Sequence, residues 1–369
     1  MPGVYISYPF CAQKCTYCNF ASGVFPPELE PRYLAALRAE IGRVGMHNGT
    51  WPWTPETVYL GGGTPSQVDP EALAALLNMI PGGPPKSEWT EATMEAAPGA
   101  VTKEKAAAWR RAGIDRVSLG VQSFVQKEIA RTGRRHTAEI VEREVAILRE
   151  ASIESINIDL IAGLPSQTEE SWKTSLDWVE RLSVPHVSVY MLEIDEDSRL
   201  GRELIAGGPR YGAMDVPSDD AIASFYEIAT ERLKELGIER YEISNFAKLG
   251  HESRHNLKYW RREPYLGFGA DAHSFDGIAR WQNPETAAEY VAGFPTPSRT
   301  PADARGEKWF LGLRLREGIE IGGETDESRE FQEVVERILN DGLAERTEGR
   351  LRLTNRGILL SNEIFAEFV

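Results

Sequence analysis

The chain has 369 residues, and 41% of them are hydrophobic, which allows one large or two smaller folded domains with a substantial core. Its formal net charge of −15 argues against broad binding to nucleic acids or anionic membranes, because those partners need a basic face. No apolar run is long enough to cross a membrane, and the N-terminus does not resemble a signal peptide, so we expect no integral membrane segment and a cytoplasmic protein.

Strand-like and helix-like segments alternate along the first two thirds of the chain. The predicted strands are short β-prone runs at Val4–Phe10, Thr57–Leu60, Thr93–Ala96, Arg116–Val121, Ser155–Ile161 and Val187–Leu192. The predicted helices carry apolar residues at intervals of three and four, at Arg32–Val44, Pro70–Met79, Lys103–Ala112, Ala138–Ala151, Glu169–Leu182 and Asp219–Leu236. Repeated β–α units imply parallel strands with right-handed crossovers. Because six units fall short of a closed eight-fold barrel, we predict an α/β fold with a partial (β/α)6 barrel and a site at its carboxyl-end mouth.

The loop after the first predicted strand carries all three cysteines of the chain, Cys11, Cys15 and Cys18. Iron–sulfur clusters are usually held by four thiolates, so three from one loop favour a four-iron cluster with one iron open to a small chelating molecule. Structural zinc would need a fourth Cys or His ligand, and this loop contains no histidine. A disulfide would leave an odd thiol, and cysteines that only pack in a core rarely cluster. A cluster is therefore the favoured interpretation.

Glycine and polar residues recur where the other predicted strands end. Strand two runs into three consecutive glycines and Thr64, which let a backbone approach a ligand, and no Gly-Lys-Ser/Thr follows to make a P-loop. The remaining strands contain or lead to Glu95, Gln122, Asp159 and Glu193. One such residue alone would be an ordinary helix cap or solvated end, but their recurrence favours a shared mouth.

Ser253–Trp260 is predicted to be loop-like and places His255 beside two large aromatic residues. Imidazole is a common axial ligand of heme iron, and flat apolar rings suit the faces of a porphyrin. A lone histidine is more often a hydrogen-bonded structural residue, and His251 and His273 are nearby alternatives. His255 is thus a candidate heme ligand.

A Pro- and Thr-rich stretch at 293–305 predicts a linker between a barrel domain, residues 1–292, and a C-terminal domain, residues 306–369. Residues from about 239 to 292 would extend the barrel and carry the heme motif. The C-terminal elements are predicted helices at Lys308–Arg314, Ser328–Asn340 and Asn355–Phe368, and a hairpin of Leu343–Arg346 and Leu351–Thr354. This pattern is typical of a small winged-helix-like α+β module, and its many acidic residues favour a cap or a partner surface over DNA binding.

The strings YISYPFCAQKCTYCNF, VYLGGGTPS, RVSLGVQSF, NIDLIAGLP, HNLKYW and YLGFGADAHS occur in that order. Together they resemble radical S-adenosylmethionine (SAM) proteins of the oxygen-independent coproporphyrinogen III oxidase-like group, and most closely its heme-chaperone branch. The resemblance covers nearly the whole chain. It implies a [4Fe-4S] cluster on Cys11, Cys15 and Cys18, SAM on the open iron, and heme as a further ligand with His255 on its iron.

The resemblance also implies roles for single residues. SAM would be lined by Tyr5, Tyr17, Gly62, Gly63, Thr64 and Glu95, with the glycine backbone near its methionine end and the carboxylate on its ribose. Gln122, Arg134 and Asp159 match positions that contact SAM in the oxidase relatives. From the residues alone, Arg134 with Arg135 fits a solvated pair equally well, and Tyr17 fits ordinary loop packing.

Three positions depart from the pattern of the group. The oxidases carry another cysteine two residues after the third cluster ligand, whereas Asn19 and Phe20 follow Cys18 here, which favours the chaperone branch. Ala97 replaces a polar residue, and Asp271 stands where glycine is usual.

The first functional hypothesis is therefore a chaperone that carries heme to an acceptor protein, with respiratory proteins as one class of acceptor. The second is a radical SAM oxidase that decarboxylates coproporphyrinogen III. The third is a cluster-bearing interaction protein whose C-terminal module docks a respiratory or membrane partner.

Overall fold

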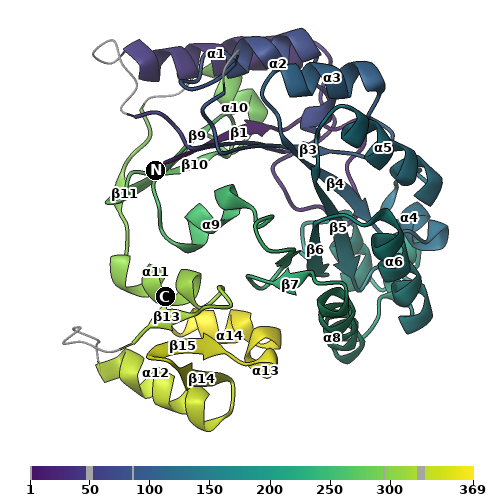
Figure 1. The fold of residues 1–369 in the computed structure, drawn as a ribbon, viewed down its shortest axis with the longest axis vertical. Helices are drawn as coiled ribbons and strands as arrows, with labels where there is room; N and C mark the ends of the chain where they lie inside the picture. The colour runs from purple at the N-terminus through teal and green to yellow at the C-terminus, as the bar shows by residue number, and fades with distance from the viewer. Residues whose placement is uncertain (1, 47–52, 85–86, 294–295, 322–328) are drawn as a thin grey trace.

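The computed structural model describes residues 2–46, 53–84, 87–293, 296–321 and 329–369. Within them the main feature is a twelve-stranded sheet whose six central strands are parallel and follow chain order. These strands are β1 (Gly3–Tyr8), β2 (Thr57–Gly62), β3 (Glu91–Ala96), β4 (Arg116–Gln122), β5 (Ser155–Ala162) and β6 (His186–Met191). Figure 1 shows the sheet curving around the short helix α9 (Arg254–Trp260). The predicted α/β fold with six central parallel strands is confirmed.

Helices cover the outer face of this curved sheet (Figure 1). They are α1 (Leu29–Met46), α2 (Pro70–Leu77), α3 (Lys103–Arg111), α4 (Gln126–Thr132), α5 (Ala138–Glu150), α6 (Glu169–Leu182) and α8 (Asp219–Glu235). The short helix α7 (Arg199–Ile205) instead contacts the loop after β1, where the Leu200 N–H donates to the Thr16 carbonyl at 2.8 Å, and 3₁₀ turns occur at Pro65–Gln67 and Arg210–Asp215. All six predicted helices are present within a few residues of their expected ends. The helices α4 and α7 were not predicted, because seven residues are too few to display a 3.6-residue repeat.

The strands separate apolar from polar side chains by alternation. In β4, Val117 and Leu119 are fully buried in the hydrophobic core. The intervening Ser118 points to the opposite, inner face, where it meets Asn157 and Asp159 of the neighbouring strand. The core thus lies between the sheet and the outer helices, and the inside of the curve is left for polar groups.

Short strands extend the sheet at both edges. Beside β6 lie the antiparallel strands β8 (Asn245–Ala247) and β7 (Glu239–Arg240). Beside β1 lie β9 (Tyr265–Phe268), which is parallel to it, and the antiparallel β10 (His273–Phe275), β11 (Ala279–Gln282) and β12 (Thr300–Pro301). The helix α10 (Ala287–Ala292) follows β11. None of these elements was predicted, since each has only two to six residues.

The prediction that Ser253–Trp260 is loop-like is wrong. Ser253 is the N-cap of α9, and its hydroxyl accepts a hydrogen bond from the Asn256 N–H at 3.3 Å. The carboxylate of Glu91 also accepts from the N–H groups of Arg254 and His255, at 2.9 and 3.0 Å. A helix of two turns is unstable alone, so α9 depends on this tertiary anchor, which the local sequence does not reveal.

The C-terminal module consists of helices and a three-stranded antiparallel sheet of order β13-β15-β14. Its elements are α11 (Ala304–Gly312), β13 (Ile319–Glu320), α12 (Arg329–Asn340), β14 (Ala344–Thr347), β15 (Arg350–Leu353), α13 (Asn355–Leu359) and α14 (Ser361–Ala366). The predicted hairpin is β14–β15, and the predicted final helix is two helices that meet at Leu360. Ser328, the predicted start of α12, lies outside the described residues, and the domain limits at 292 and 306 stay predictions.

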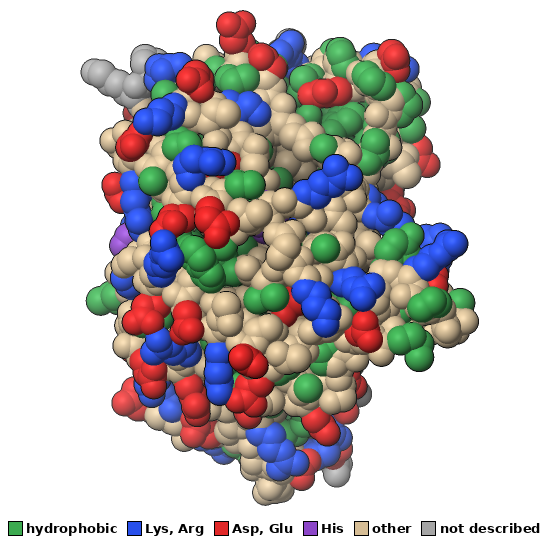
Figure 2. Space-filling model, turned by 90° about the vertical axis from the view of Figure 1, so that its right-hand side faces the viewer, with side chains coloured by type: hydrophobic (Ala, Val, Ile, Leu, Met, Phe, Trp, Pro, Cys, Tyr) green, Lys and Arg blue, Asp and Glu red, His purple; other side chains and the backbone are tan. Residues whose placement is uncertain are grey.

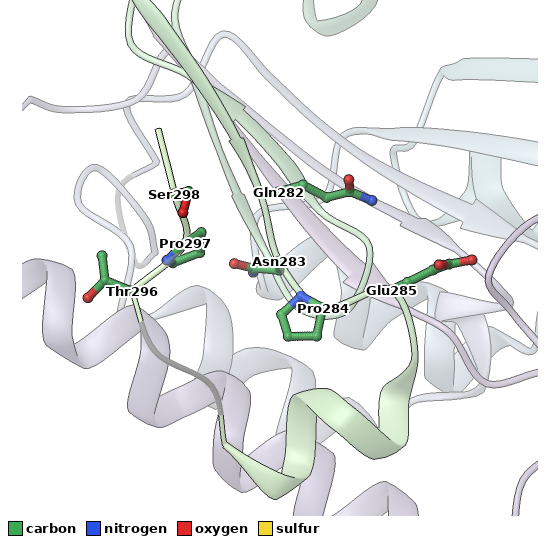
Figure 3. A pocket seen from close by; sticks show the side chains of 7 residues that line it. All are labelled: Gln282, Asn283, Pro284, Glu285, Thr296, Pro297 and Ser298. Atoms are coloured by element: carbon green, nitrogen blue, oxygen red, sulfur yellow. The ribbon is translucent and has the colours of Figure 1, made fainter. Parts of the chain in front are cut away.

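One face and one pocket of the surface are shown in the figures. Figure 2 shows acidic and basic side chains interspersed over the face that carries α4, α5 and α6. Figure 3 shows a pocket between residues 282–285 and 296–298. Its volume is about 350 Å³. The amide of Asn283 in this pocket is already engaged, because it donates to Glu40 and to the Gly269 carbonyl. No helix among the described residues is long and apolar enough to span a membrane.

Candidate functional site

The three cysteines lie on the loop that joins β1 to α1, at the carboxyl end of the strand. All three are free thiols and half-buried. The loop is fixed at several points: the Cys11 N–H donates to the Gly23 carbonyl at 2.8 Å, and the Thr16 N–H donates to the Thr132 carbonyl at 3.2 Å. The predicted ligands are therefore on a well-anchored loop at the predicted mouth.

Each thiol has its own polar neighbour. The hydroxyl of Thr64 is 3.6 Å from Cys11 Sγ, Arg134 Nε donates to Cys15 Sγ at 3.2 Å, and the hydroxyl of Ser22 is 3.9 Å from Cys18 Sγ. In the described part of the chain, no three His, Cys, Asp or Glu side chains converge on one point, and this includes the three cysteines. Their chemistry and common loop fit a thiolate-held cluster, and the side chains would have to turn toward one another to hold it.

The glycines that follow β2 pack directly against the cysteine loop. Gly63 donates to the Tyr8 carbonyl at 2.8 Å, and Thr64 donates to the Phe10 carbonyl at 2.9 Å. A Cβ atom on Gly63 would lie 2.7 Å from the Phe10 carbonyl oxygen, which is too close for any side chain. Gly62 has φ +107°, in the region that favours glycine, and its N–H donates to Glu95. The triple glycine is thus required for two loops to meet.

Glu95, near the end of β3, joins the same region. Its carboxylate accepts from the Tyr59 hydroxyl at 2.9 Å and from the Gly62 N–H at 3.1 Å. Burial, and then the negative charge of Asp159, raises the pKa of Glu95 to about 7. A carboxyl group in this range can accept or donate a hydrogen bond near neutral pH, which suits a polar ligand group.

Asp159 lies on the inner face of β5, close enough to influence Glu95. It accepts hydrogen bonds from the Ser118 hydroxyl at 3.1 Å and from the Asn157 amide at 2.7 Å. Burial raises the pKa of Asp159, and these hydrogen bonds oppose the shift. The sequence reasoning missed Ser118 and Asn157. Ser118 lies two positions before Gly120, and Asn157 lies two positions before Asp159. Because side chains two apart share one face of a strand, this spacing could have placed both residues at the site.

Gln122 and Arg134 meet over the end of β4. Gln122 has φ +70° where the β4–β5 register shifts, a backbone conformation uncommon outside glycine. A Cβ atom on Gly120 would lie 3.1 Å from Gln122 Nε2 and 3.4 Å from Arg134 Nη1, so both side chains cover this glycine. Arg134 also donates to the Gly120 carbonyl at 2.5 Å. Its contacts with Gly120 and Cys15 exclude a solvated side chain, whereas Arg135 is exposed.

The two tyrosines flank this arrangement. Tyr5 on β1 stacks on Tyr59 with ring centroids 6.1 Å apart. Tyr17 precedes the last cysteine and is half-buried. Burial raises the pKa of its hydroxyl, and the nearby positive charge of Arg134 opposes this shift. The structure therefore brings all nine predicted SAM contacts to the same side of the sheet as the cysteines, and their roles remain predictions.

His255 lies elsewhere. Its Nδ1 is 2.8 Å from the Thr57 hydroxyl, its Nε2 is 2.8 Å from the Tyr259 hydroxyl, and its ring stacks on Tyr59. Thr57 begins β2 and Gly62 ends it, so His255 and the cysteine mouth are separated by the length of that strand, about 16 Å. The imidazole is fully buried with both nitrogens occupied, and an axial role would require a rearrangement around α9. Of the alternatives, His273 is exposed and His251 is half-buried.

Comparisons with known proteins find relatives both by sequence and by fold. The sequence pattern of the Radical SAM superfamily matches residues 5–179, and that of the HemN C-terminal domain matches residues 300–360. The structure resembles coproporphyrinogen III oxidase (HemN) from Escherichia coli, a radical SAM enzyme, with a TM-score of 0.81 over 100% of this chain and 90% of that one. The two sequences are 22% identical, so this likeness concerns the fold.

Two curated relatives are similar over nearly their whole length. The heme chaperone HemW of Bacillus subtilis is 34% identical over 100% of this chain and 99% of its own length. The heme chaperone HemW of Mycobacterium tuberculosis is 37% identical over 98% of this chain and 93% of its own length. The chain therefore belongs to the HemW family of radical SAM proteins.

Proposed function

We propose that this protein is a heme chaperone, which binds heme and passes it to an acceptor protein. The full-length similarity to HemW proteins carries the proposal. Asn19 and Phe20 support it, because the extra cysteine of the oxidases is absent from a loop that otherwise has all three cluster thiols.

The cluster and SAM belong to the same proposal. Cys11, Cys15 and Cys18 would hold a [4Fe-4S] cluster, since they are free and share one anchored loop at the mouth. Bound SAM would complete the coordination of the open iron and could supply one-electron chemistry. This chain would hold it with the glycine backbone at 62–63, the carboxylate of Glu95 and the side chains of Gln122 and Arg134 that cover Gly120.

Heme binding is tested by titrating heme into the full-length protein under anaerobic conditions and following the Soret band. We expect about one heme per chain, and transfer of that heme to an added apo-hemoprotein. Iron analysis of the reconstituted protein should give about four irons per chain, lost when Cys11, Cys15 or Cys18 is replaced by Ala. A wild-type protein that takes up no heme would overturn the chaperone proposal. Formation of protoporphyrinogen from coproporphyrinogen would favour the oxidase.

The contacts of His255 give a sharper test of the axial ligand than its removal alone. Tyr259→Phe deletes the hydroxyl on Nε2 and leaves the imidazole in place. If His255 ligates heme iron through Nε2, this variant should bind heme more tightly than wild type, by about tenfold, since one hydrogen bond no longer competes. His255→Ala should weaken binding and shift the Soret band. Unchanged heme affinity in both variants would remove His255 from the site, with His251→Ala as the next candidate.

A further inference from the structure

The inner face of the curved sheet contains a buried arginine, Arg116, that has no role in the site at the cysteine mouth. Arg116 begins β4 and is 3% exposed. Within the described part of the chain, its Nε has no hydrogen-bond partner and its guanidinium forms no ion pair. Arginine stays charged in proteins, and a buried ion without a partner costs several kcal/mol. A residue of this kind needs an acceptor.

A second polar atom without a partner lies beside it. Thr93 on β3 is the register partner of Arg116 on β4, and paired residues of parallel strands point to the same face. Thr93 is 0% exposed, and its hydroxyl oxygen has no hydrogen-bond partner among the described residues. A guanidinium and a hydroxyl that both lack partners therefore stand side by side on the inner face of the sheet.

The two carboxylates closest in the sheet are already engaged. Glu91 begins β3, and its oxygens accept from Ser253 and from the N–H groups of Arg254 and His255. Asp159 accepts from Ser118 and Asn157. Neither forms a hydrogen bond with Arg116, so the sheet itself supplies no oxygen to the guanidinium.

Two histidine rings, His255 and His186, lie near the guanidinium of Arg116 and carry no negative charge. Burial, and then the positive charges of Lys258 and Arg116, lowers the pKa of His255 to about 3. Burial and the charge of Arg116 hold the pKa of His186 well below its ordinary value. Both imidazoles are therefore neutral near pH 7 and add no charge beside Arg116.

We propose that Arg116 and Thr93 bind one small planar oxyanion, of the size of formate or bicarbonate. The guanidinium presents two parallel N–H groups that match two oxygens of such an ion, and the Thr93 hydroxyl can donate to one of them. The low exposure of both residues limits the ligand to a few atoms. The proposal does not depend on heme or on the cluster.

The test is thermal unfolding of the full chain in HEPES at constant ionic strength, with increasing sodium formate. Formate should raise the melting temperature of the wild type in a saturable manner, because a ligand of the native state stabilises it. Arg116→Met should abolish this response, and Thr93→Val should weaken the apparent affinity by about tenfold. Arg232→Met is the matched control: it removes the same charge from a surface arginine on α8 and should leave the formate response intact.

Two results would overturn the proposal. One is a wild-type response to formate that is absent or no greater than that to chloride, because chloride lacks the planar pair of oxygens. The other is an unchanged formate affinity in Thr93→Val together with an unchanged response in Arg116→Met. If Arg116→Met did not fold, Arg116→Lys would replace it. Lysine keeps the positive charge but lacks the two parallel N–H groups, so an unchanged formate affinity in that variant would also reject the site.

Discussion

At the scale of single residues, Gly63 is a position beside the cysteine loop that leaves no room for a side chain. Gly63→Ala would place a methyl group 2.7 Å from the Phe10 carbonyl oxygen and force the glycine turn away from the cysteine loop. We expect a loss of about 1–3 kcal/mol in the free energy of unfolding and a reduced iron content after reconstitution. Urea unfolding and iron analysis measure the two effects.

Gly23→Ala is the control for this change. Gly23 also contacts the cysteine loop through its backbone, yet a Cβ atom there would meet nothing closer than 3.7 Å. It should leave iron content and stability near wild type. Equal behaviour of the two variants would mean that close packing of the glycine turn does not hold the loop.

The raised pKa of Glu95 predicts that the stability of the protein depends on pH. Its pKa is raised from 4.5 to about 7, so between these values the folded state binds more protons than the unfolded state. The free energy of unfolding should therefore fall as pH rises toward and through 7, by about 1 kcal/mol between pH 6 and 8. Glu95→Gln should remove this component, which urea unfolding of cofactor-free protein at both pH values measures. An identical pH dependence in variant and wild type would contradict the shift.

The sequence predicted the cysteines, the glycines and Glu95 at one mouth, because strand ends of a parallel sheet meet there. The sequence did not predict which side chains would contact the cysteines and Glu95. Arg134 reaches Cys15 across 119 positions of the chain, and such a pairing depends on the curvature of the sheet. The conformation of Asp271 was also not predictable from the sequence. Its φ of +59° lies in the left-handed region that favours glycine, and only the structure shows that aspartate adopts this conformation here.

At the scale of elements, α9 closes the inner side of the sheet, and His255 is one of its main anchors. His255→Ala removes a fully buried ring and leaves the hydroxyls of Thr57 and Tyr259 without that partner. We expect a loss of about 2–4 kcal/mol in stability by urea unfolding, whatever the variant does to heme. The exposed His273→Ala should have little effect. Wild-type stability of His255→Ala would show that α9 is held by Glu91 alone.

The same element shows why sequence periodicity reaches only part of this fold. The six central strands and the long helices repeat their pattern often enough to be recognised. By contrast, α9 and the edge strands β7 to β12 are two to seven residues long, and tertiary contacts decide their conformation. The motif containing His255 was therefore expected to be loop-like, whereas it forms a helix in which His255 is buried.

At the scale of the whole molecule, buried charges join the C-terminal module to the sheet. Arg314 follows α11 and donates to Glu242 at 3.2 Å, and its guanidinium lies 4.2 Å from the centre of the Trp260 ring of α9. A second junction joins Glu307 of α11 to Arg262 and Arg280. The module is thus attached directly to the element that carries His255.

The junction of Arg314 and Glu242 predicts an asymmetry between variants. Glu242 is 0% exposed, so Arg314→Met leaves a buried carboxylate without its ion pair and should cost about 3–5 kcal/mol. Glu242→Gln should cost less, because its amide oxygen can still accept from the Ser244 N–H and the remaining arginine is partly exposed. The double variant should be more stable than Arg314→Met alone, since it no longer buries an unpaired charge. Urea unfolding of all four proteins gives the coupling, and proteolysis near residues 293–305 shows whether the module loosens. A double variant less stable than Arg314→Met would mean that Glu242 stabilises the junction through its other hydrogen bonds and not through the ion pair.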